Sequence, residues 1–313
     1  MSVICIGEAL IDMICTDKGS SLSDGQHFLK KPGGAPTNVA AAIGALGGEV
    51  LLSAKVGNDP FGKQLKHVMA EFQVDTTRVH LDSNHFTTFA FVSLMLDGER
   101  DFVFNRGADA ELTVEEVNQI DLSQTNIIHF GSATAFLNGP LNAAYYHLLE
   151  AAKNTGKTIS FDPNYRHLLF GDKIPSFIKQ SMIFLKEADF TKLSDEEAML
   201  ITETETLEEA TDALLGLCPG VFAITLGKEG TLLGLAGKTY TIPSIPVKPV
   251  DTTGAGDAFV GAVLYQLDGL NIQDLDFAAW KKIVENANKA GARTCEYLGA
   301  MEAFKNLNNS IFN

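Results

Sequence analysis

The segment Asp251–Leu264 (DTTGAGDAFVGAVL) holds the residue types and spacing best suited to chemistry. Gly254, Ala255 and Gly256 are small enough for backbone to approach a ligand closely, and a strongly helical pattern follows them. A glycine-rich turn that opens a helix directs several free N–H groups, and the positive end of the helix dipole, at one point. The pattern therefore predicts an anion-binding loop at the start of a helix.

Asp257 is the unusual member of this segment, because a carboxylate repels an anion bound beside it. The pairing makes sense if Asp257 faces a hydroxyl group that attacks a phosphoryl group. Asp257 would then accept the hydroxyl proton while the loop amides take up charge on the transferred group. The alternative is that Asp257 only complements the helix dipole, a common role worth ~0.3–1 kcal/mol. The motif alone leaves both interpretations open.

A second glycine-rich turn lies within Lys31–Leu46 (KPGGAPTNVAAAIGAL). Gly33 and Gly34 end a strand-like stretch, and an alanine-rich helix follows them. Asn38 in the first turn of this helix could present its amide to a sugar hydroxyl, and the glycine pair would let backbone touch the ligand. In isolation, a tight turn followed by a capped helix is the more usual explanation of such residues.

The elements that must position these segments alternate between short apolar runs and longer helical patterns. The apolar runs are continuous, as expected for a sheet covered on both faces, so the sequence predicts an α/β fold with a mostly parallel sheet. The expected strands are Val3–Gly7, Val50–Val56, Ile127–Phe130, Thr158–Asp162, Phe190–Leu193, Val221–Leu226 and Thr231–Leu235. The expected helices include Pro60–Phe72 with Asp59 as N-cap, Leu141–Lys153, Ser194–Thr202, Leu207–Leu217 and Ala258–Leu267.

Two stretches, approximately 13–32 and 86–106, interrupt the alternation with strand-like or turn-rich sequence. Thr88–Leu96, the turn Asp97-Gly98 and Arg100–Asn105 together predict a β-hairpin. Small strands inserted into an α/β core often cover a site, although an ordinary sheet edge would give the same pattern. No linker or internal repeat marks a boundary in the sequence, so we expect a single domain over residues 1–313.

Charge and composition disfavour several classes of function. The chain has 24 basic and 39 acidic residues, a net charge of −15, which repels nucleic acids and anionic membrane surfaces. Its four cysteines are scattered without a CxxC pair, as in proteins of reducing compartments. The N-terminus resembles a first strand rather than a signal peptide. We therefore expect a cytoplasmic protein without nucleic-acid or membrane partners.

The sequence excludes two common nucleotide-binding motifs. Gly57–Gln64 (GNDPFGKQ) begins like a P-loop, but Gln64 stands where a magnesium-binding Ser or Thr is needed. Pro60 also removes one of the backbone N–H donors that such a loop uses. The first strand ends in GEALID rather than in a glycine-rich Rossmann turn.

Taken together, the segments resemble the PfkB (ribokinase-like) family of carbohydrate kinases. GGAPTNVAAAIGALG is similar to the N-terminal signature of the family, and DTTGAGDAFVGAVL is similar to its C-terminal signature. GEALID, KVGNDPFG, DPNYR and TLGKEG resemble further family blocks in the family order. The likeness spans essentially the whole chain, and DPNYR and KLSDEE make it most similar to the fructokinase branch.

The resemblance implies a three-layer α/β/α ribokinase-like sandwich with a small β-strand lid. It also implies ATP and Mg²⁺ as co-substrates and direct in-line transfer to a primary sugar hydroxyl. Asp257 would be the base, with Gly254, Ala255 and Gly256 forming the anion hole. The residues that would hold sugar hydroxyls are Asp12, Gly33, Gly34 and Asn38. A carboxylate such as Asp12 suits a polyol, because it accepts several hydroxyl hydrogen bonds.

Further roles follow from the same resemblance. Arg166 would contact sugar or phosphate, or pair with a surface carboxylate, and Arg106 is a second candidate for the substrate site. Candidate nucleotide contacts are Lys192, Thr225, Gly227, Gly230 and Asn288, the last of which could equally be an exposed helix residue. Ser194 replaces an Asn of the family, whereas Glu197 is retained and would organise Mg²⁺ through water. Asp251 and Thr253 match positions that hold a monovalent cation in many members, so K⁺ is a candidate ion.

D-fructose is the expected substrate, giving ADP and D-fructose 6-phosphate. 2-Keto-3-deoxygluconate is the alternative within the family, because Arg106 or Arg166 could bind its carboxylate bidentately. A sugar-binding regulator without catalytic activity is the alternative from another class, although it need not retain the GAGD motif with Asp257. The apolar strand Thr88–Leu96 could also pair with a second copy, giving a homodimer through the lid.

Overall fold

The computed structural model describes residues 2–94 and 100–312. Its large sheet contains β1 (Val3–Ile6), β4 (Val50–Gly57), β5 (Val79–Asp82), β8 (Ile127–Phe130), β9 (Thr158–Phe161), β10 (Phe190–Ser194), β11 (Val221–Thr225), β12 (Thr231–Leu235) and β13 (Lys238–Ile242). The strand order is β13-β12-β11-β10-β9-β8-β1-β4-β5, and the pairs from β11 to β5 are parallel. β12 and β13 continue the sheet antiparallel. The predicted mostly parallel sheet is confirmed.

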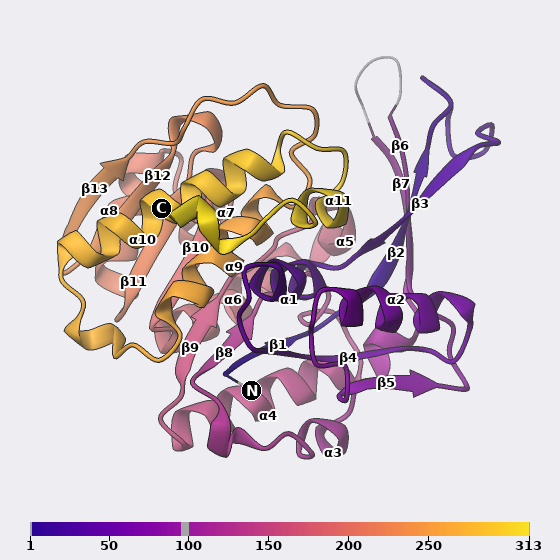
Figure 1. Ribbon diagram of the computed structural model, residues 1–313, viewed down its shortest axis with the longest axis horizontal. Coiled ribbons are helices and arrows are strands. Elements are labelled where there is room, and N and C mark those ends of the chain that lie inside the picture. The colour runs from indigo at the N-terminus through magenta and orange to yellow at the C-terminus, as the bar shows by residue number, and fades with distance from the viewer. Residues whose placement is uncertain (1, 95–99, 313) are drawn as a thin grey trace.

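Helices cover both faces of this sheet and bury two separate apolar clusters, which gives three layers (Figure 1). One face packs against α1 (Ala35–Ala45), α2 (Pro60–Glu71), α9 (Ala255–Leu267), α10 (Phe277–Thr294) and α11 (Ala300–Phe304). The other face packs against α3 (Val114–Val117), α4 (Pro140–Asn154), α5 (His167–Phe170), α6 (Ile174–Glu187), α7 (Asp195–Thr202) and α8 (Leu207–Leu217). No helix of residues 2–94 and 100–312 is long and apolar enough to cross a membrane.

The middle of the large sheet contains a topological switch between β1 and β8. From β1 the chain continues through α1 to β4 on one side, and from β8 it continues through α4 to β9 on the other. Open α/β sheets bind ligands outside the carboxyl ends of the strands at such a point. Glu8 follows β1 there, and Ser132 follows β8.

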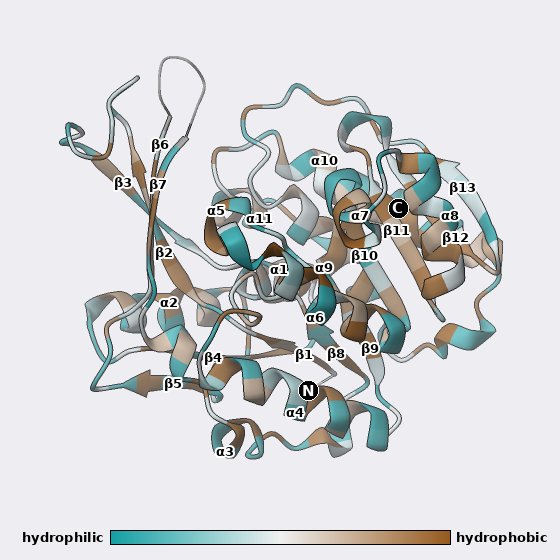
Figure 2. Ribbon diagram, turned by 180° about the vertical axis from the view of Figure 1, so that it is seen from behind, coloured by the Kyte–Doolittle hydropathy of each residue, from teal (hydrophilic) through white to brown (hydrophobic). Residues whose placement is uncertain are grey.

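A second sheet of four strands projects from the main body beside α2 (Figure 1). It contains β2 (Leu10–Cys15), β3 (Phe28–Gly33), β6 (Phe89–Leu94) and β7 (Arg100–Asn105) in the order β3-β2-β6-β7. β2 and β6 are parallel, whereas the two outer pairs are antiparallel. Much of β2, β6 and β7 is hydrophobic, as Figure 2 shows. We call these four strands the small sheet.

The small sheet corresponds to the segments expected to form a lid, so an ordinary edge of the large sheet is excluded. It begins at Leu10, three residues before the expected start, because Leu10 and Ile11 already pair with β3 and β6. The predicted turn Asp97-Gly98 lies outside the described residues. The predicted start of α2 is confirmed, since Asp59 accepts hydrogen bonds from the backbone N–H groups of Phe61 and Gly62 (both 2.9 Å).

Candidate active site

The glycine-rich turn before α9 opens the helix as predicted, but the helix begins at Ala255, three residues earlier than expected. Gly254 occupies the N-cap position with φ +81°, a conformation that favours glycine, and a Cβ there would collide with Ala300. A Cβ on Gly256 would meet only the Lys192 side chain, with the Nζ atom at 3.4 Å. The first turn of α9 therefore combines backbone amides with an adjacent ammonium group, and the Ala255 N–H donates to the Thr252 carbonyl (3.2 Å).

Asp257 lies in the first turn of α9 and is 9% exposed. Its Oδ2 atom accepts a hydrogen bond from Nδ2 of Asn38 (2.8 Å), which joins α9 to α1. Burial raises the pKa of Asp257, while the Asn38 hydrogen bond and the positive charges of Arg166 and Lys192 oppose the rise. A carboxylate of raised pKa beside an anion-binding turn has the placement and basicity to take a proton from an attacking hydroxyl group.

The second glycine-rich turn brings Asp12 and α1 together. A Cβ on Gly33 would collide with Oδ2 of Asp12, so glycine is required where β3 passes this carboxylate. Gly34 has φ +106° at the N-cap of α1, and a Cβ there would collide with the carbonyl oxygen of Glu8. Asn38 donates to Asp257, but its own Oδ1 atom is buried without a hydrogen-bond partner. This oxygen is an acceptor that a ligand can satisfy.

The positive charge of Arg166 affects the pKa of both candidate carboxylates, Asp12 and Asp257. Burial raises the pKa of Asp12 to about 6, and the Arg166 guanidinium opposes that rise as it does for Asp257. Arg166 is exposed and donates to the carbonyl of Tyr165 (3.1 Å) and to Oδ1 of Asn164 (3.3 Å). Among the residues that the structure describes, Arg166 makes no ion pair with a surface carboxylate. The structure thus groups Arg166 with Asp12 and Asp257.

Lys192 and Asp162 form a buried ion pair under the start of α9. Nζ of Lys192 lies 3.1 Å from Oδ2 of Asp162 and 3.9 Å from Oε2 of Glu197. Burial would lower the pKa of Lys192, but these carboxylates outweigh burial and raise it, so the side chain is a cation. Burial raises the pKa of Asp162 to about 7, with Lys192 opposing. Sequence reasoning missed Asp162, whose signal was its place at the end of β9 in DPNYR.

Glu197 holds two segments through its carboxylate. Oε1 accepts from the backbone N–H of Tyr165 and Oε2 from that of Ser194 (both 2.8 Å). The Ser194 hydroxyl accepts from the backbone N–H of Glu197 (3.1 Å), which completes a capping box at the start of α7. Serine thus provides this cap at the position where the family has Asn. In the described part of the chain, no three His, Cys, Asp or Glu side chains gather as a ready metal site.

The candidate nucleotide residues cluster at the ends of β11, β12 and β13. The hydroxyl of Thr225 donates to the carbonyl of Leu193 (3.2 Å), and a Cβ on Gly230 would collide with the carbonyl of Ile242. Asn288 is buried, so the alternative of an exposed helix residue is wrong. Its Oδ1 accepts from the Thr231 hydroxyl (2.7 Å), and its Nδ2 donates to the carbonyl of Ile242 (3.1 Å). Asn288 therefore supports the segment after β13.

The remaining candidates are Arg106 for the substrate and Asp251 with Thr253 for a monovalent cation, and they hydrogen-bond to other groups of the protein. Arg106 donates from three nitrogens to Oδ2 of Asp109 (3.2 Å) and to the carbonyls of Asn138 (2.5 Å) and Thr134 (3.1 Å). Asp251 accepts from the backbone N–H and hydroxyl of Thr253 (3.0 and 2.8 Å) and from the N–H of Gly299 (2.8 Å). Burial would raise the pKa of Asp251, but these hydrogen bonds hold it below the usual value.

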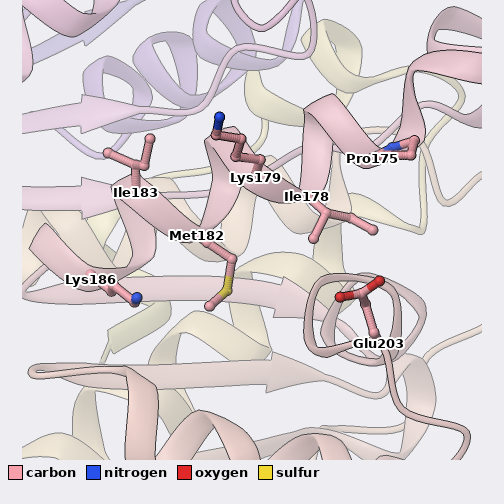
Figure 3. A pocket seen from close by; sticks show the side chains of 7 residues that line it. All are labelled: Pro175, Ile178, Lys179, Met182, Ile183, Lys186 and Glu203. Atoms are coloured by element: carbon pink, nitrogen blue, oxygen red, sulfur yellow. The ribbon is translucent and has the colours of Figure 1, made fainter.

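Two grooves differ in their relation to this site. The first, of about 360 Å³, lies between β7 and the segment after Arg166, and its lining is Phe102, Phe104, Arg106, Leu137, Asn138, Leu168, Leu169 and Lys173. The second, of about 520 Å³, runs along α6. Figure 3 shows Ile178 and Met182 on the side of α6 that faces Glu203, with Lys179 and Ile183 on the other side. The α6 groove contains none of the candidate site residues.

The geometry defines a class of enzyme. A buried carboxylate of raised pKa at an amide-rich helix start, on which the positive charges of Arg166 and Lys192 act, is suited to phosphoryl transfer to an alcohol. The chain matches the model of the pfkB family carbohydrate kinases over residues 1–306 and belongs to this family. It is thus a carbohydrate kinase, a phosphotransferase with an alcohol group as acceptor.

Relatives and solved structures agree with this assignment. The chain is 37% identical over 309 residues to Fructokinase-1 of Zea mays, covering 96% of this chain and 93% of that protein. It is similar to fructokinase from Vibrio cholerae O395 in fructose, ADP and calcium ion bound form (TM-score 0.86, 33% identity, 100% and 98% coverage). It is also similar to a putative ribokinase II from E. coli in complex with ATP and Mg²⁺ (TM-score 0.86, 26% identity, 99% and 97% coverage). The predicted ribokinase-like α/β fold is confirmed.

Proposed function

We propose that the chain is a fructokinase that transfers the γ-phosphoryl group of ATP to the 6-hydroxyl group of D-fructose. The observation that carries the proposal is Asp257, buried in the first turn of α9 and hydrogen-bonded to Asn38. Asp257 accepts the proton of the attacking hydroxyl group. The amides of Gly254, Ala255 and Gly256 bind the transferred group, whose charge spreads over its oxygens. Fructose in the similar Vibrio cholerae structure supports the choice of sugar.

The sugar lies between the two glycine-rich turns in this proposal. Asp12 accepts hydroxyl hydrogen bonds, and the unpartnered Oδ1 of Asn38 accepts another. Gly33 and Gly34 let the backbone approach the ring, and Arg166 contacts the sugar or the phosphate. Arg106, with three nitrogens already donating within the protein, supports the base of the small sheet next to the substrate.

The nucleotide occupies the ends of β10 to β13. The chain fits ATP there, because Lys192 is a buried cation beside Gly256 and because Thr225, Gly227 and Gly230 form a glycine-containing turn. Asn288 holds the neighbouring segment in place. Bound Mg²⁺ would neutralise charge on the phosphate oxygens. Glu197 fits Mg²⁺ only through water, since both carboxylate oxygens already accept backbone hydrogen bonds.

The candidate K⁺ site lies in the loop before α9. Asp251 is held in ionised form by hydrogen bonds to Thr253 and Gly299, so an oxygen-rich loop is present where a monovalent cation is expected. A cation bound there would lie at the entrance of the anion-binding turn. Its occupancy would favour ordering of residues 251–254.

Three broader expectations accompany this function. We infer a single kinase domain over residues 1–313, with the small sheet as a lid. Free cysteines and the net charge of −15 support a cytoplasmic protein without nucleic-acid or membrane partners. A homodimer through the lid is supported by apolar side chains exposed on the small sheet, namely Ile14, Leu29 and Val103.

Product analysis tests the proposed function. With ATP, Mg²⁺ and D-fructose, ADP should form only when the sugar is present, and phosphorus NMR should show a sugar 6-phosphate. A product carrying phosphate at another hydroxyl would contradict the placement of the sugar. ATP hydrolysis that does not depend on the sugar would also contradict the proposal, whereas sugar binding without ADP formation would favour the sugar-binding regulator.

A further inference from the structure

A buried polar side chain outside the transfer site occupies the switch point of the large sheet. Glu8 is 1% exposed and lies two residues after the end of β1. Its Oε1 atom accepts from the backbone N–H groups of Ala35 (3.0 Å) and Ala133 (3.3 Å), and its Oε2 atom accepts from the Ser132 hydroxyl (2.5 Å). Glu8 thus connects the ends of β1 and β8 to the start of α1.

The hydrogen bonds continue from Ser132 to the base of the small sheet. The backbone N–H of Thr134 donates to the Ser132 hydroxyl oxygen (3.2 Å), and the Thr134 hydroxyl donates to Oδ2 of Asp109 (2.9 Å). Asp109 also accepts from the Thr88 hydroxyl and from Nε of Arg106 (3.2 Å). Thr88 precedes β6 and Arg106 follows β7, so Asp109 contacts both sides of the hairpin where it leaves the main body. We call Glu8, Ser132, Thr134 and Asp109 the Glu8–Asp109 chain.

The first end of this chain fixes the turn that carries the candidate sugar contacts. Gly34 supplies no side-chain cap to α1, and the Ala35 N–H that would lack a partner is satisfied by Glu8 instead. The carbonyl of Glu8 also accepts from the Thr37 hydroxyl (2.9 Å). The next residue, Asn38, donates to Asp257. A shift of Glu8 would therefore displace Asn38 relative to Asp257.

We propose that the Glu8–Asp109 chain links the seating of the small sheet to the placement of α1, so that Glu8, Ser132, Thr134 and Asp109 are positioning residues for the sugar. The kinetic part of this inference rests on the proposed fructokinase function. All four side chains are at most 4% exposed, and buried hydrogen bonds of this kind are costly to break. Within residues 2–94 and 100–312, Asp109 is the only member of the Glu8–Asp109 chain that forms an ion pair, and its partner is Arg106.

Thr134→Val tests the chain at its middle link, because valine keeps the shape of threonine and removes only the hydroxyl group. Its KM for D-fructose should rise about five- to tenfold, the order expected for one lost buried hydrogen bond, while KM for MgATP stays within twofold. Thr134→Ser retains the hydroxyl and should restore the wild-type KM. The matched control is Thr211→Val, a buried threonine of α8 that donates to the Leu207 carbonyl (2.6 Å), which should alter neither KM.

Hydrogen exchange of the substrate-free protein gives a readout that does not depend on activity. Thr134→Val should increase amide exchange both in residues 34–39 and in residues 86–91, at the two ends of the chain, whereas Thr211→Val should change neither. In the double variant Thr134→Val with Glu8→Gln, the increase in amide exchange should be smaller than the sum of the increases in the two single variants. The reason is that both substitutions break the same Glu8–Asp109 chain. Faster exchange confined to the neighbourhood of Thr134, or an unchanged fructose KM, would overturn the proposal.

Two results separate the failure of this proposal from other failures. If the wild-type protein phosphorylates no fructose, the proposed function fails, and the exchange pattern still decides whether the chain couples its two ends. If Thr134→Val does not fold, Ser132→Ala breaks the adjacent link and is measured in the same way. An exchange pattern in Ser132→Ala that leaves residues 86–91 as in wild type would then overturn the coupling.

Discussion

Asp12 and Asp257 carry the same carboxylate group but lie in different environments. Burial raises the pKa of both, but Asp257 sits at the start of a helix and is held by Asn38. Asp12 instead lies on β2 of the small sheet, packed against Gly33. We therefore expect Asp257 to act as the base near the transferred group and Asp12 to accept hydrogen bonds from hydroxyl groups.

Asp257→Asn should keep the fold and the affinity for the sugar while lowering kcat by roughly 10²–10⁴, the usual range for a positioned acid–base group. Asparagine preserves the shape and can still meet Asn38, but it cannot take a proton. The measurement is steady-state turnover together with calorimetric binding of D-fructose. Near-normal turnover in this variant would mean that Asp257 only complements the helix dipole.

Asp12→Ala should raise the KM or Kd for the sugar while binding of MgATP stays close to normal. Loss of a carboxylate that accepts hydroxyl hydrogen bonds costs about 1.5–3 kcal/mol, which corresponds to a roughly 10- to 150-fold weaker affinity. Asp24→Ala, an exposed carboxylate in the loop of the same sheet, serves as the control. Equal loss of sugar and nucleotide affinity would indicate a folding defect rather than a sugar contact.

Glu8 should make the stability of the protein depend on pH. Burial raises the pKa of Glu8 to about 7, so between about pH 4.5 and 7 the folded state retains a proton that the unfolded chain has released. Stability therefore falls as pH rises through this window, and Glu8→Gln should remove roughly 1–3 kcal/mol of that fall. Asp12 and Asp162 contribute in the same direction and remain in the variant.

Urea unfolding at several pH values measures this effect. The control is Glu208→Gln, an exposed residue of α8, which should follow the wild-type profile. Parallel profiles for wild type and Glu8→Gln would show that Glu8 ionises in the folded protein as it does in the unfolded chain.

At the residue scale, the sequence predicts which side chains are candidate site residues, but not which other side chains they contact. Asp257 and Asn38 stand out in their own glycine-rich segments, yet they are 219 positions apart, and no local pattern pairs them. Asp162, Asp109 and Glu8 were missed because a single acidic residue just after a strand, or in a short 3₁₀ turn, looks like an ordinary loop residue. Burial and long-range hydrogen bonds, which give these residues their importance, exist only in the folded chain.

At the scale of elements, the two helix starts of α1 and α9 make the site. Both have a glycine of positive φ at the N-cap, and neither has a side-chain cap from that residue. The helices pack closely, since a Cβ on Gly261 of α9 would approach Ala42 of α1 to 2.7 Å. This close packing allows Asn38 to reach Asp257. The two N-termini thus converge on one position.

Gly256→Val should abolish most turnover without unfolding the protein. The position has room for a side chain apart from Lys192, so the cost falls on the anion site, where a β-branched group would separate the amides from a phosphoryl group. Turnover should fall by about 10²-fold or more, the order seen when an oxyanion donor is lost. Gly216→Val in α8, where a Cβ meets nothing within 4 Å, is the matched control. An active, folded Gly256→Val enzyme would show that this turn does not hold phosphate.

Most elements could be predicted from their apolar patterns, and the exceptions have physical causes. β13 is an edge strand in which only Ile242 is buried, so its pattern is polar. β5 is buried only at Val79 and Asp82, so it lacks the continuous apolar run that marks the equally short β1 and β8. α9 begins before its apolar run, because its first turn faces the site rather than the core. Edge strands and functional helix starts lack the apolar signal on which sequence prediction depends.

At the scale of the whole molecule, the site lies where three parts meet. The switch point between β1 and β8, the two helix starts and the small sheet all contribute, and Glu8 connects the switch point directly to the start of α1. The order of strands could not be predicted from the sequence, although the mostly parallel sheet could. The order of strands depends on the face of the sheet over which each connection between strands passes. That choice leaves no local trace in the chain.

The choice of substrate also belongs to this scale. The net charge of −15 slightly disfavours an anionic sugar acid at low salt. Asp12 acts at short range and more strongly, because charges that are close together and partly buried are poorly screened. Arg106, which could compensate a substrate carboxylate, already donates to Asp109 and two carbonyls. A neutral ketohexose is therefore expected over 2-keto-3-deoxygluconate.

Competition among four acceptors at one MgATP concentration tests this account most directly. D-fructose, 2-keto-3-deoxygluconate, ribose and adenosine are supplied together, and the phosphorylated products are quantified over the initial phase of the reaction. We expect D-fructose to have the highest kcat/KM and to give the dominant product. A dominant phosphorylated sugar acid would contradict the fructokinase proposal while leaving the role of Asp257 intact.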